Sequence, residues 1–201
     1  MTWQPFDVTD CDPSPFVQFR RWYDEAAPVM AEREAIALVT ATPDGRPSVR
    51  MVLMRRLGED SFGWYTNYES RKAVELAANP RAALLWYCEP LGRQIRVEGS
   101  VMRSSPEDSD AYFATRARRS QIGAHASHQS HPLASRGALE ARVELLEAQF
   151  VGREIPRPEN WGGYVLTPDA FEFWQHRENR LHDRVIYSLE GGIWRFERYA
   201  P

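Results

Sequence analysis

Short apolar segments, paired across tight turns, constrain this fold more than any other feature. The segments "AIALVTA" (35–41) and "SVRMVLMR" (48–55) flank Asp44-Gly45, and "RVIYSL" and "IWRFERY" flank Gly191-Gly192. Both dipeptides are strong hairpin signals, because their residues tolerate the backbone angles of a two-residue turn. We therefore predict antiparallel strands that pair with their neighbours along the chain.

The same patterns place the other elements. Further strands are predicted at 62–67, 81–88 and 93–103, and after residue 161 we expect "GGYVL" and "FEFWQ" to be two more. Helices are predicted after Ser14-Pro15, over 69–80 up to Asn79-Pro80, over 105–116 and over 138–150, with the polar segment 118–137 an irregular loop between the last two. This β-rich order with inserted helices favours a small closed barrel over a doubly wound sheet.

Composition excludes several classes of protein. The 201 residues carry a net charge of −3, which argues against general nucleic-acid binding. No apolar run is long enough to span a membrane, and no secretory leader is evident. The two cysteines, Cys11 and Cys88, are too few for a disulfide framework, so we expect a cytoplasmic protein.

Two cations at the start of a predicted helix suggest a phosphate site. Arg71 and Lys72 follow Ser70, which is expected to cap the helix with its hydroxyl. Free N–H groups at a helix start attract anions, and cations there are otherwise mildly unfavourable. The alternative is a basic first turn on a solvated helix.

Other polar residues are ambiguous on their own. Arg50 lies in an apolar strand and would face a ligand or solvent, and Gln94 in "RQIRV" has the same ambiguity. Tyr112, Arg116 and Ser120 are spaced by four residues, so they would share one face if the segment is a single helix. That face could bind an anion, or it could simply be solvated.

The segment "RLHDR" (180–184) bunches cations between apolar runs. If it is extended, Arg180, His182 and Arg184 face one way, with Leu181 anchoring the segment from the other side. The group would then bind an anion near Trp174, unless cross-strand acids such as Glu172 or Glu197 neutralise it.

A metal site and hydrolytic chemistry are weakly supported. His125, His128 and His131 form H-x-x-H-x-x-H without an acidic or cysteine ligand inside the run, so we predict no metal. The chain has no nucleophile elbow, no P-loop and no G-x-G-x-x-G.

Several blocks in order resemble the pyridoxine/pyridoxamine 5′-phosphate oxidase family. They are "RMVLMR", "YTNYESRKAVELAANPR", "RQIRVEG", "YFATRARRSQIGAHASHQS", "WGGY", "FEFWQHRENRLHDR" and "ERYAP". The resemblance implies an FMN-binding split β-barrel that is active as a homodimer, with clefts shared by both subunits. It divides the chain into an N-terminal arm (1–12), a split-barrel domain with a helical insertion (13–160) and a C-terminal dimerisation segment (161–201).

The resemblance also implies an activity and its residues. FMN would oxidise pyridoxamine or pyridoxine 5′-phosphate to pyridoxal 5′-phosphate, and O2 would be reduced to H2O2. The implied FMN contacts are Arg50, Met51, Val52, Leu53, Met54, Arg55, Tyr65, Thr66, Arg71, Lys72, Gln94, Gln129, Ser130, Trp174 and Arg184. The implied substrate contacts are Arg55, Tyr112, Arg116, Ser120, Arg180, Leu181 and His182, of which Arg180 and His182 would orient the substrate for catalysis.

Two departures from the family pattern bear on the substrate. Arg55 stands where the family usually has Lys, and the two cations differ in reach and planarity. The arm before the first helix is short and lacks the family's basic and tyrosine residues. An oxidase of a non-vitamin substrate, such as a phenazine-type intermediate, and a flavin- or pyridoxal-phosphate-binding protein without turnover therefore stay open as alternatives.

Overall fold

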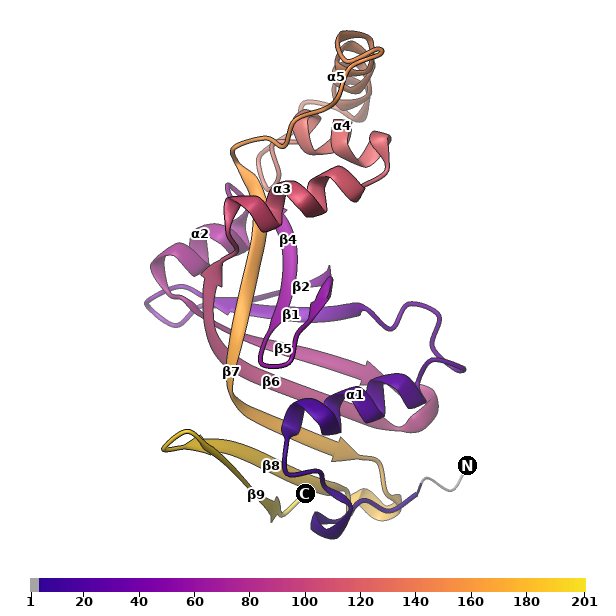
Figure 1. The fold of residues 1–201 in the computed structure, drawn as a ribbon, viewed down its shortest axis with the longest axis vertical. Helices are drawn as coiled ribbons and strands as arrows, with labels where there is room; N and C mark the ends of the chain where they lie inside the picture. The colour runs from indigo at the N-terminus through magenta and orange to yellow at the C-terminus, as the bar shows by residue number, and fades with distance from the viewer. Residues whose placement is uncertain (1–3) are drawn as a thin grey trace.

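A single antiparallel sheet organises the chain, which the computed structural model describes over residues 4–201 (Figure 1). Its strands follow the order β2-β1-β5-β6-β7-β4-β3, while β8 pairs with β7 and with β9. The strands are β1 (Ala35–Ala41), β2 (Pro47–Leu53), β3 (Arg56–Leu57), β4 (Phe62–Asn67), β5 (Arg81–Cys88), β6 (Arg93–Arg103), β7 (Trp161–Gln175), β8 (Asp183–Glu190) and β9 (Ile193–Tyr199). The predicted mainly β, antiparallel architecture with added helices is confirmed.

The strand β7 links the two ends of the molecule. We expected its sequence to form two strands, but "GGYVL" and "FEFWQ" belong to one strand of 15 residues. Its first half pairs with β4 and its second half with β8, and β6 runs along both. The register of β6 against β7 shifts between Glu98 and Gly99, which is a bulge that bends the pair. The sheet therefore curls into a half-barrel without breaking β7.

The helices gather at one end of the sheet and over its concave side. They are α1 (Pro15–Glu25), α2 (Arg71–Ala78), α3 (Pro106–Thr115), α4 (Arg118–Ala126) and α5 (Arg136–Gln149), and short 3-10 turns lie at η1 (Val8–Asp10), η2 (Glu89–Leu91) and η3 (Glu178–Arg180). Figure 1 shows α3, α4 and α5 at the end of β7 opposite to β8 and β9.

One helix was missed. We expected 118–137 to be an irregular loop, but Arg118–Ala126 forms α4. Its apolar residues are few, and Ile122 and Ala126 are nevertheless buried. Ile122 packs in a small cluster with Phe113 and Trp161, so tertiary contacts stabilise a helix whose own sequence pattern is weak.

The main core lies between α1 and the sheet. Ser14 caps α1 as expected, because its hydroxyl accepts a hydrogen bond from the Val17 amide. The Phe16 ring meets Phe171 at 5.2 Å and the Trp22 ring meets Phe173 at 5.3 Å, both edge to face. This packing fixes α1 against β7 and leaves the helical end of the sheet for other contacts.

The N-terminal arm packs against the rest of the molecule over the part that the structure describes. Residues 1–3 lie outside the described residues. Phe6 is buried against Trp22, and its amide donates to the Asp183 carboxylate at 3.1 Å. Arg198 donates to the Phe6 carbonyl at 3.0 Å. Local sequence patterns do not predict these contacts, because Asp183 and Arg198 lie near the other end of the chain.

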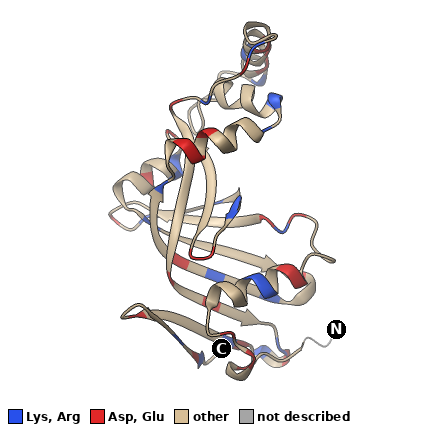
Figure 2. Ribbon diagram, viewed as in Figure 1, with Lys and Arg blue, Asp and Glu red and all other residues tan. Residues whose placement is uncertain are grey.

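The described residues show how charge is distributed and whether any helix could span a membrane. Figure 2 shows Lys and Arg interspersed with Asp and Glu along the ribbons of residues 4–201. Within the same residues, the structure contains no helix that is both long and apolar enough to cross a membrane.

Candidate functional site

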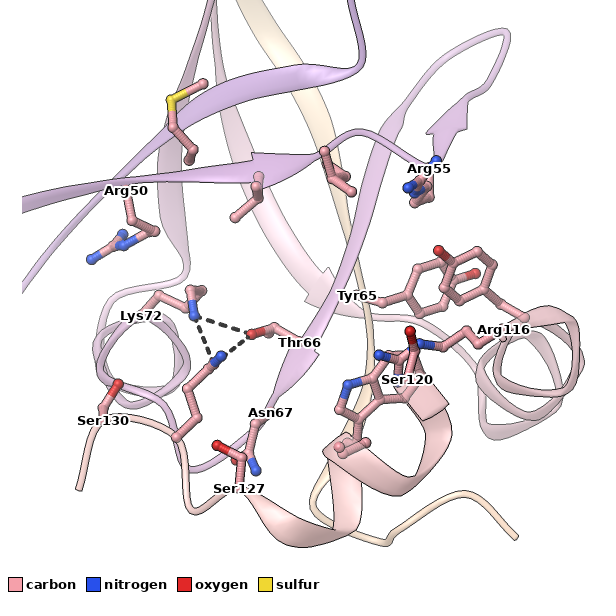
Figure 3. Close-up of a pocket in the computed structure, with 18 of the residues that line it drawn as sticks. Arg50, Arg55, Tyr65, Thr66, Asn67, Lys72, Arg116, Ser120, Ser127 and Ser130 are labelled. Atoms are coloured by element: carbon pink, nitrogen blue, oxygen red, sulfur yellow. Dashed lines mark hydrogen bonds between the residues drawn. The ribbon is translucent and has the colours of Figure 1, made fainter. Parts of the chain in front are cut away.

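A cleft of about 1150 Å³ opens where the helical end meets strands β2 and β4. Its walls come from β2, β4, the start of α2, the α3–α4 corner and the loop that follows α4 (Figure 3). The structure brings together these residues of the expected site: Arg50, Met51, Val52, Leu53, Arg55, Tyr65, Thr66, Arg71, Lys72, Tyr112, Arg116, Ser120, Gln129 and Ser130. Segments up to 80 residues apart in sequence thus line one space.

One end of the cleft is built around a buried lysine. Lys72 donates to Thr66 Oγ1 at 3.1 Å, to Ser70 Oγ at 3.2 Å and to Gln129 Oε1 at 3.0 Å. Burial, assisted by the nearby charge of Arg50, lowers the pKa of Lys72 to about 8. Among residues 4–201, the hydrogen-bond partners of this cation are neutral oxygens, so an anion would stabilise it strongly.

The start of α2 differs from the prediction in one respect. Ser70 occupies the N-cap position, but its side chain makes no capping hydrogen bond and accepts from Lys72 instead. The amide of Arg71 donates to Ser130 Oγ at 3.1 Å, and Ser130 adopts a positive φ of 69°. A hydroxyl from the loop after α4 therefore takes the place that the sequence assigned to Ser70.

A carboxylate connects the cations at this end. Glu75 Oε1 accepts from Arg71 Nε at 2.8 Å, and Glu75 Oε2 accepts from the hydroxyls of Thr40 and Ser48, each at 2.5 Å. Arg50 donates to both hydroxyls and lies 3.5 Å from the carboxylate. Burial alone would raise the pKa of Glu75, but the hydrogen bonds from Ser48, Thr40 and Arg71 outweigh it and lower the pKa to about 2.

The opposite end of the cleft is aromatic and cationic. The rings of Tyr65 and Tyr112 stack at 3.8 Å with an interplanar angle of 11°, and Trp161 lies nearly parallel to both. The Arg116 guanidinium lies over the Trp161 ring at 4.6 Å. Burial lowers the pKa of Arg116, and its buried Nη1 has no hydrogen-bond partner within residues 4–201. An unpaired buried donor of this kind is suited to an anionic ligand.

The expected helical face of Tyr112, Arg116 and Ser120 does not exist as one helix. The helix α3 ends at Thr115, Arg116 has extended angles (φ −72°, ψ 144°), and α4 begins at Arg118. All three side chains still line the cleft, because the corner between the helices wraps around it. Figure 3 shows Arg116 and Ser120 near Tyr65, with Arg55 on the strand side.

Consecutive residues of β2 line the cleft, and their exposure alternates along the strand. Arg50 and Val52 are half-buried, whereas Met51 and Leu53 are exposed. Met54 was expected to touch the cofactor, but its side chain is 6% exposed and packs into the core. Arg55 lines the cleft and lies 3.6 Å from the Glu34 carboxylate.

The remaining expected site residues lie at the other end of β7. The strand register places Gln94, Trp174 and Arg184 side by side on β6, β7 and β8. Trp161, which lines the cleft, precedes Trp174 by 13 residues on β7, or roughly 40 Å of extended chain. One protomer therefore does not unite these residues with its own cleft. Arg184 is paired with the buried Glu172 at 2.9 Å, as the cross-strand alternative proposed.

The segment "RLHDR" is not extended throughout. Residues 178–180 form η3, in which Arg180 has a positive φ of 62°, and β8 begins only at Asp183. The expectation of one cationic face on an extended strand is therefore wrong, because this turn separates Arg180 from Arg184. Leu181 is 68% exposed, so it does not anchor the segment within the protomer.

His182 belongs to an aromatic group around Trp174. Its ring lies 4.5 Å from that of Trp174 and 5.1 Å from that of His176, and its Nδ1 accepts from the Arg177 amide at 3.1 Å. This tautomer leaves Nε2–H as a donor. Burial, together with the charges of His176 and Arg180, lowers the pKa of His182, which favours the neutral ring.

The three spaced histidines have separate surroundings. His125 Nε2 contacts the Pro156 carbonyl at 2.7 Å, and His131 Nδ1 contacts the Gln129 carbonyl at 3.1 Å. Across residues 4–201, no group of three or more His, Cys, Asp or Glu side chains is arranged to hold a metal ion.

Sequence reasoning missed other residues that shape the cleft, among them Asn67, Glu75, Ser127 and Trp161, of which Glu75 lies behind the lining. The i,i+4 spacing of Arg71 and Glu75 could have revealed the second of them. The others carried no usable signal, since a Trp before two glycines or a lone Asn or Ser is common in any fold.

Comparison with protein families matches the chain over most of its length. The model described as "Pyridoxamine 5′-phosphate oxidase" matches residues 23–150, and "Pyridoxine 5′-phosphate oxidase C-terminal dimerisation region" matches residues 161–201. A pyridoxine/pyridoxamine 5′-phosphate oxidase of Rubrobacter xylanophilus is 56% identical over 94% of this chain and 88% of its own. The enzyme of that name from Paraburkholderia phymatum is 52% identical, over 97% of this chain and 92% of its own.

Solved structures share the fold. PhzG from Burkholderia lata 383, in complex with tetrahydrophenazine-1-carboxylic acid, superposes with a TM-score of 0.93 at 31% identity and full coverage of both chains. A pyridoxamine 5′-phosphate oxidase-related, FMN-binding protein from Nostoc punctiforme has a TM-score of 0.75 at 18% identity, over 95% of this chain and all of its own. The second likeness shows the fold alone.

Proposed function

The chain belongs to the pyridoxine/pyridoxamine 5′-phosphate oxidase family, and from this premise we propose that it is an FMN-dependent oxidase of a phosphorylated B6 vitamer. The reaction would convert pyridoxine 5′-phosphate and O2 to pyridoxal 5′-phosphate and H2O2. With pyridoxamine 5′-phosphate, one water is also consumed and ammonia is released. One observation carries the proposal: a single cleft has positively charged side chains at both ends. The Lys72 end could bind the cofactor phosphate, and the Arg116 end could bind the substrate phosphate.

The Lys72 end fits the FMN phosphate. Lys72, Arg71 and Arg50 supply positive charge, and the Ser130 and Thr66 hydroxyls lie among them. Such a set of charge-assisted donors beside a helix start is the usual environment of a bound phosphate. The residues of β2 and Tyr65 would then border the flavin ring system in the body of the cleft.

The Arg116 end fits the substrate phosphate. Arg116 brings an unpaired buried donor, and Tyr112, Ser120 and Arg55 line the same end. Arg55 offers two parallel donors to a phosphate, whereas a Lys at this position would act as a point charge. The stacking of Arg116 on Trp161 holds the guanidinium in place before the substrate arrives.

We further propose that two subunits complete each site. Trp174, Arg180, His182 and Arg184 lie in the segment whose family model describes dimerisation, and they are remote from the cleft of their own protomer. A second subunit would bring them to the cleft, in accord with the homodimer that the family implies. The exposed side chains of Arg180 and Leu181 are then a contact surface for the other subunit and its substrate.

The protein's own groups would bind and orient. When bound, the flavin supplies the two-electron acceptor, and the residues place the substrate carbon against it. Arg116, Ser120 and Tyr112 fix the phosphate at one end, while Arg180 and a neutral His182 would position the ring. These are orientation roles, so the chemistry needs no strongly basic side chain at this point.

Two measurements test the proposal. The purified protein should bind FMN, visible as a flavin absorption spectrum, and should release H2O2 when pyridoxamine or pyridoxine 5′-phosphate is added. A protein that binds no FMN would contradict the cofactor assignment. FMN binding without oxidation of either vitamer phosphate would contradict the substrate assignment.

A second candidate substrate has a specific observation in its favour. PhzG, which shares the whole fold, is complexed with a tricyclic carboxylic acid rather than a phosphate ester. A carboxylate could also occupy the Arg116 end, because guanidinium pairs with both anions. Peroxide release with a tetrahydrophenazine carboxylate, at a higher kcat/KM than with either vitamer phosphate, would move the assignment to that class.

A further inference from the structure

A negative charge lies buried behind Arg71 and Arg50, at the end of the cleft that would receive a phosphate. The Glu75 side chain is 4% exposed, and its carboxylate is ionised at neutral pH, since its pKa is about 2. A carboxylate repels a nearby phosphate dianion. Glu75 would therefore weaken phosphate binding unless another of its effects strengthens that binding. Its contacts indicate what that is.

The contact with Arg71 controls the direction of the guanidinium. Glu75 Oε1 accepts from Arg71 Nε at 2.8 Å, one helical turn away on α2. A guanidinium is planar, so a bond at Nε fixes its plane and leaves both Nη groups for another acceptor. The Arg71 side chain is 64% exposed, and without this bond it would sample many rotamers.

The second carboxylate oxygen organises Arg50 through two hydroxyls. Thr40 and Ser48 each donate to Glu75 Oε2 at 2.5 Å, which turns their lone pairs toward Arg50. Arg50 Nη1 donates to Thr40 Oγ1 at 2.6 Å, and Nη2 donates to Ser48 Oγ. One buried carboxylate thus orients cations from α2 and β2 at once.

We propose that Glu75 is a positioning residue for the cofactor phosphate, which holds Arg71 and Arg50 in their binding orientation. The inference rests on the proposed function, since it takes the Lys72 end as the FMN phosphate site. The competing explanation is purely structural. Glu75 would then connect α2 to β1 and β2 and stabilise the fold, with no effect specific to phosphate binding.

FMN and riboflavin separate these explanations, because riboflavin has the same ring system and no phosphate. Both ligands are titrated into the apoprotein of the wild type, Glu75→Gln and Glu75→Asp, with flavin fluorescence as the readout. We expect Glu75→Gln to weaken FMN binding about ten-fold or more and to change riboflavin binding by less than about two-fold. Glu75→Asp, which keeps the charge, should recover part of the loss.

Three results would overturn the inference. They are unchanged FMN affinity in Glu75→Gln, tighter FMN binding, or an equal loss for both flavins. If Glu75→Gln does not fold, the same ratio of FMN to riboflavin affinity is measured for Glu75→Asp, and a wild-type ratio there also overturns it. A wild-type protein that does not prefer FMN over riboflavin would contradict the proposed phosphate site itself. A Glu75 variant that keeps the wild-type preference would contradict only the role of Glu75.

Discussion

We predict that Lys72 gives FMN binding a pH dependence. Burial and Arg50 place the Lys72 pKa at about 8 in the free protein, and a bound phosphate dianion would raise it again. Below pH 8 the amine is protonated in both states, so FMN affinity should be flat once the phosphate is a dianion. Above pH 8 binding must take up a proton, and we expect FMN affinity to fall up to about ten-fold per pH unit.

Two controls assign this effect to the lysine. Fluorescence titrations of FMN between pH 7 and pH 9.5 measure it, and riboflavin over the same range corrects for titration of the ring system. Lys72→Met should bind FMN more weakly and without the decline above pH 8. A wild-type affinity that stays constant to pH 9.5 would show that Lys72 does not titrate on binding.

At the scale of elements, the bulge in β6 shapes the half-barrel. A Cβ on Gly99 would lie 2.2 Å from the Thr167 carbonyl oxygen and 2.8 Å from Pro168 Cα, both backbone atoms of β7. Gly99→Ala should therefore lower the free energy of unfolding by roughly 1–3 kcal/mol, measured by thermal or urea denaturation. Gly137→Ala in α5 is the matched control, because its Cβ would meet only Ser135 Oγ at 3.8 Å. If Gly99→Ala and Gly137→Ala had equal stability, β6 and β7 would not be closely packed at Gly99.

At the scale of the whole molecule, the proposal that two subunits share each site predicts how mixed dimers behave. Arg116 lies at the cleft and Arg180 at the far end of β7, so each substitution to Ala should lower kcat/KM in a homodimer by roughly 10–100-fold. A heterodimer of Arg116→Ala and Arg180→Ala subunits has one site with both changes and one with neither. It should recover about half of the wild-type activity per dimer.

Differently tagged subunits, co-expressed and purified through both tags, provide the heterodimer. Each doubly tagged homodimer serves as the control for purification. A heterodimer as inactive as its parents would mean that Arg116 and Arg180 act in the same subunit's site or not at all. Retention of FMN in both variants separates loss of catalysis from loss of cofactor.

The sequence determined the strand pattern and much of the cleft. Hairpin dipeptides and alternating apolar segments act over a few residues, so β1–β2, β5–β6 and β8–β9 follow from local pattern alone. Arg71 and Lys72 were found from their position at a helix start, which is also a local property. Arg50 stayed ambiguous from the local pattern, and only the family resemblance assigned it to the cofactor site.

Only the tertiary structure decided the rest. The cap at α2 comes from Ser130 rather than Ser70, and α4 forms because Ile122 packs against residues on other elements. Arg116 reaches the cleft from a corner between helices, and the turn at Arg180 breaks the predicted face. Each of these features depends on contacts between distant parts of the chain. The free energy of such contacts outweighs local conformational preferences, and the contacts produce no periodic pattern in the sequence.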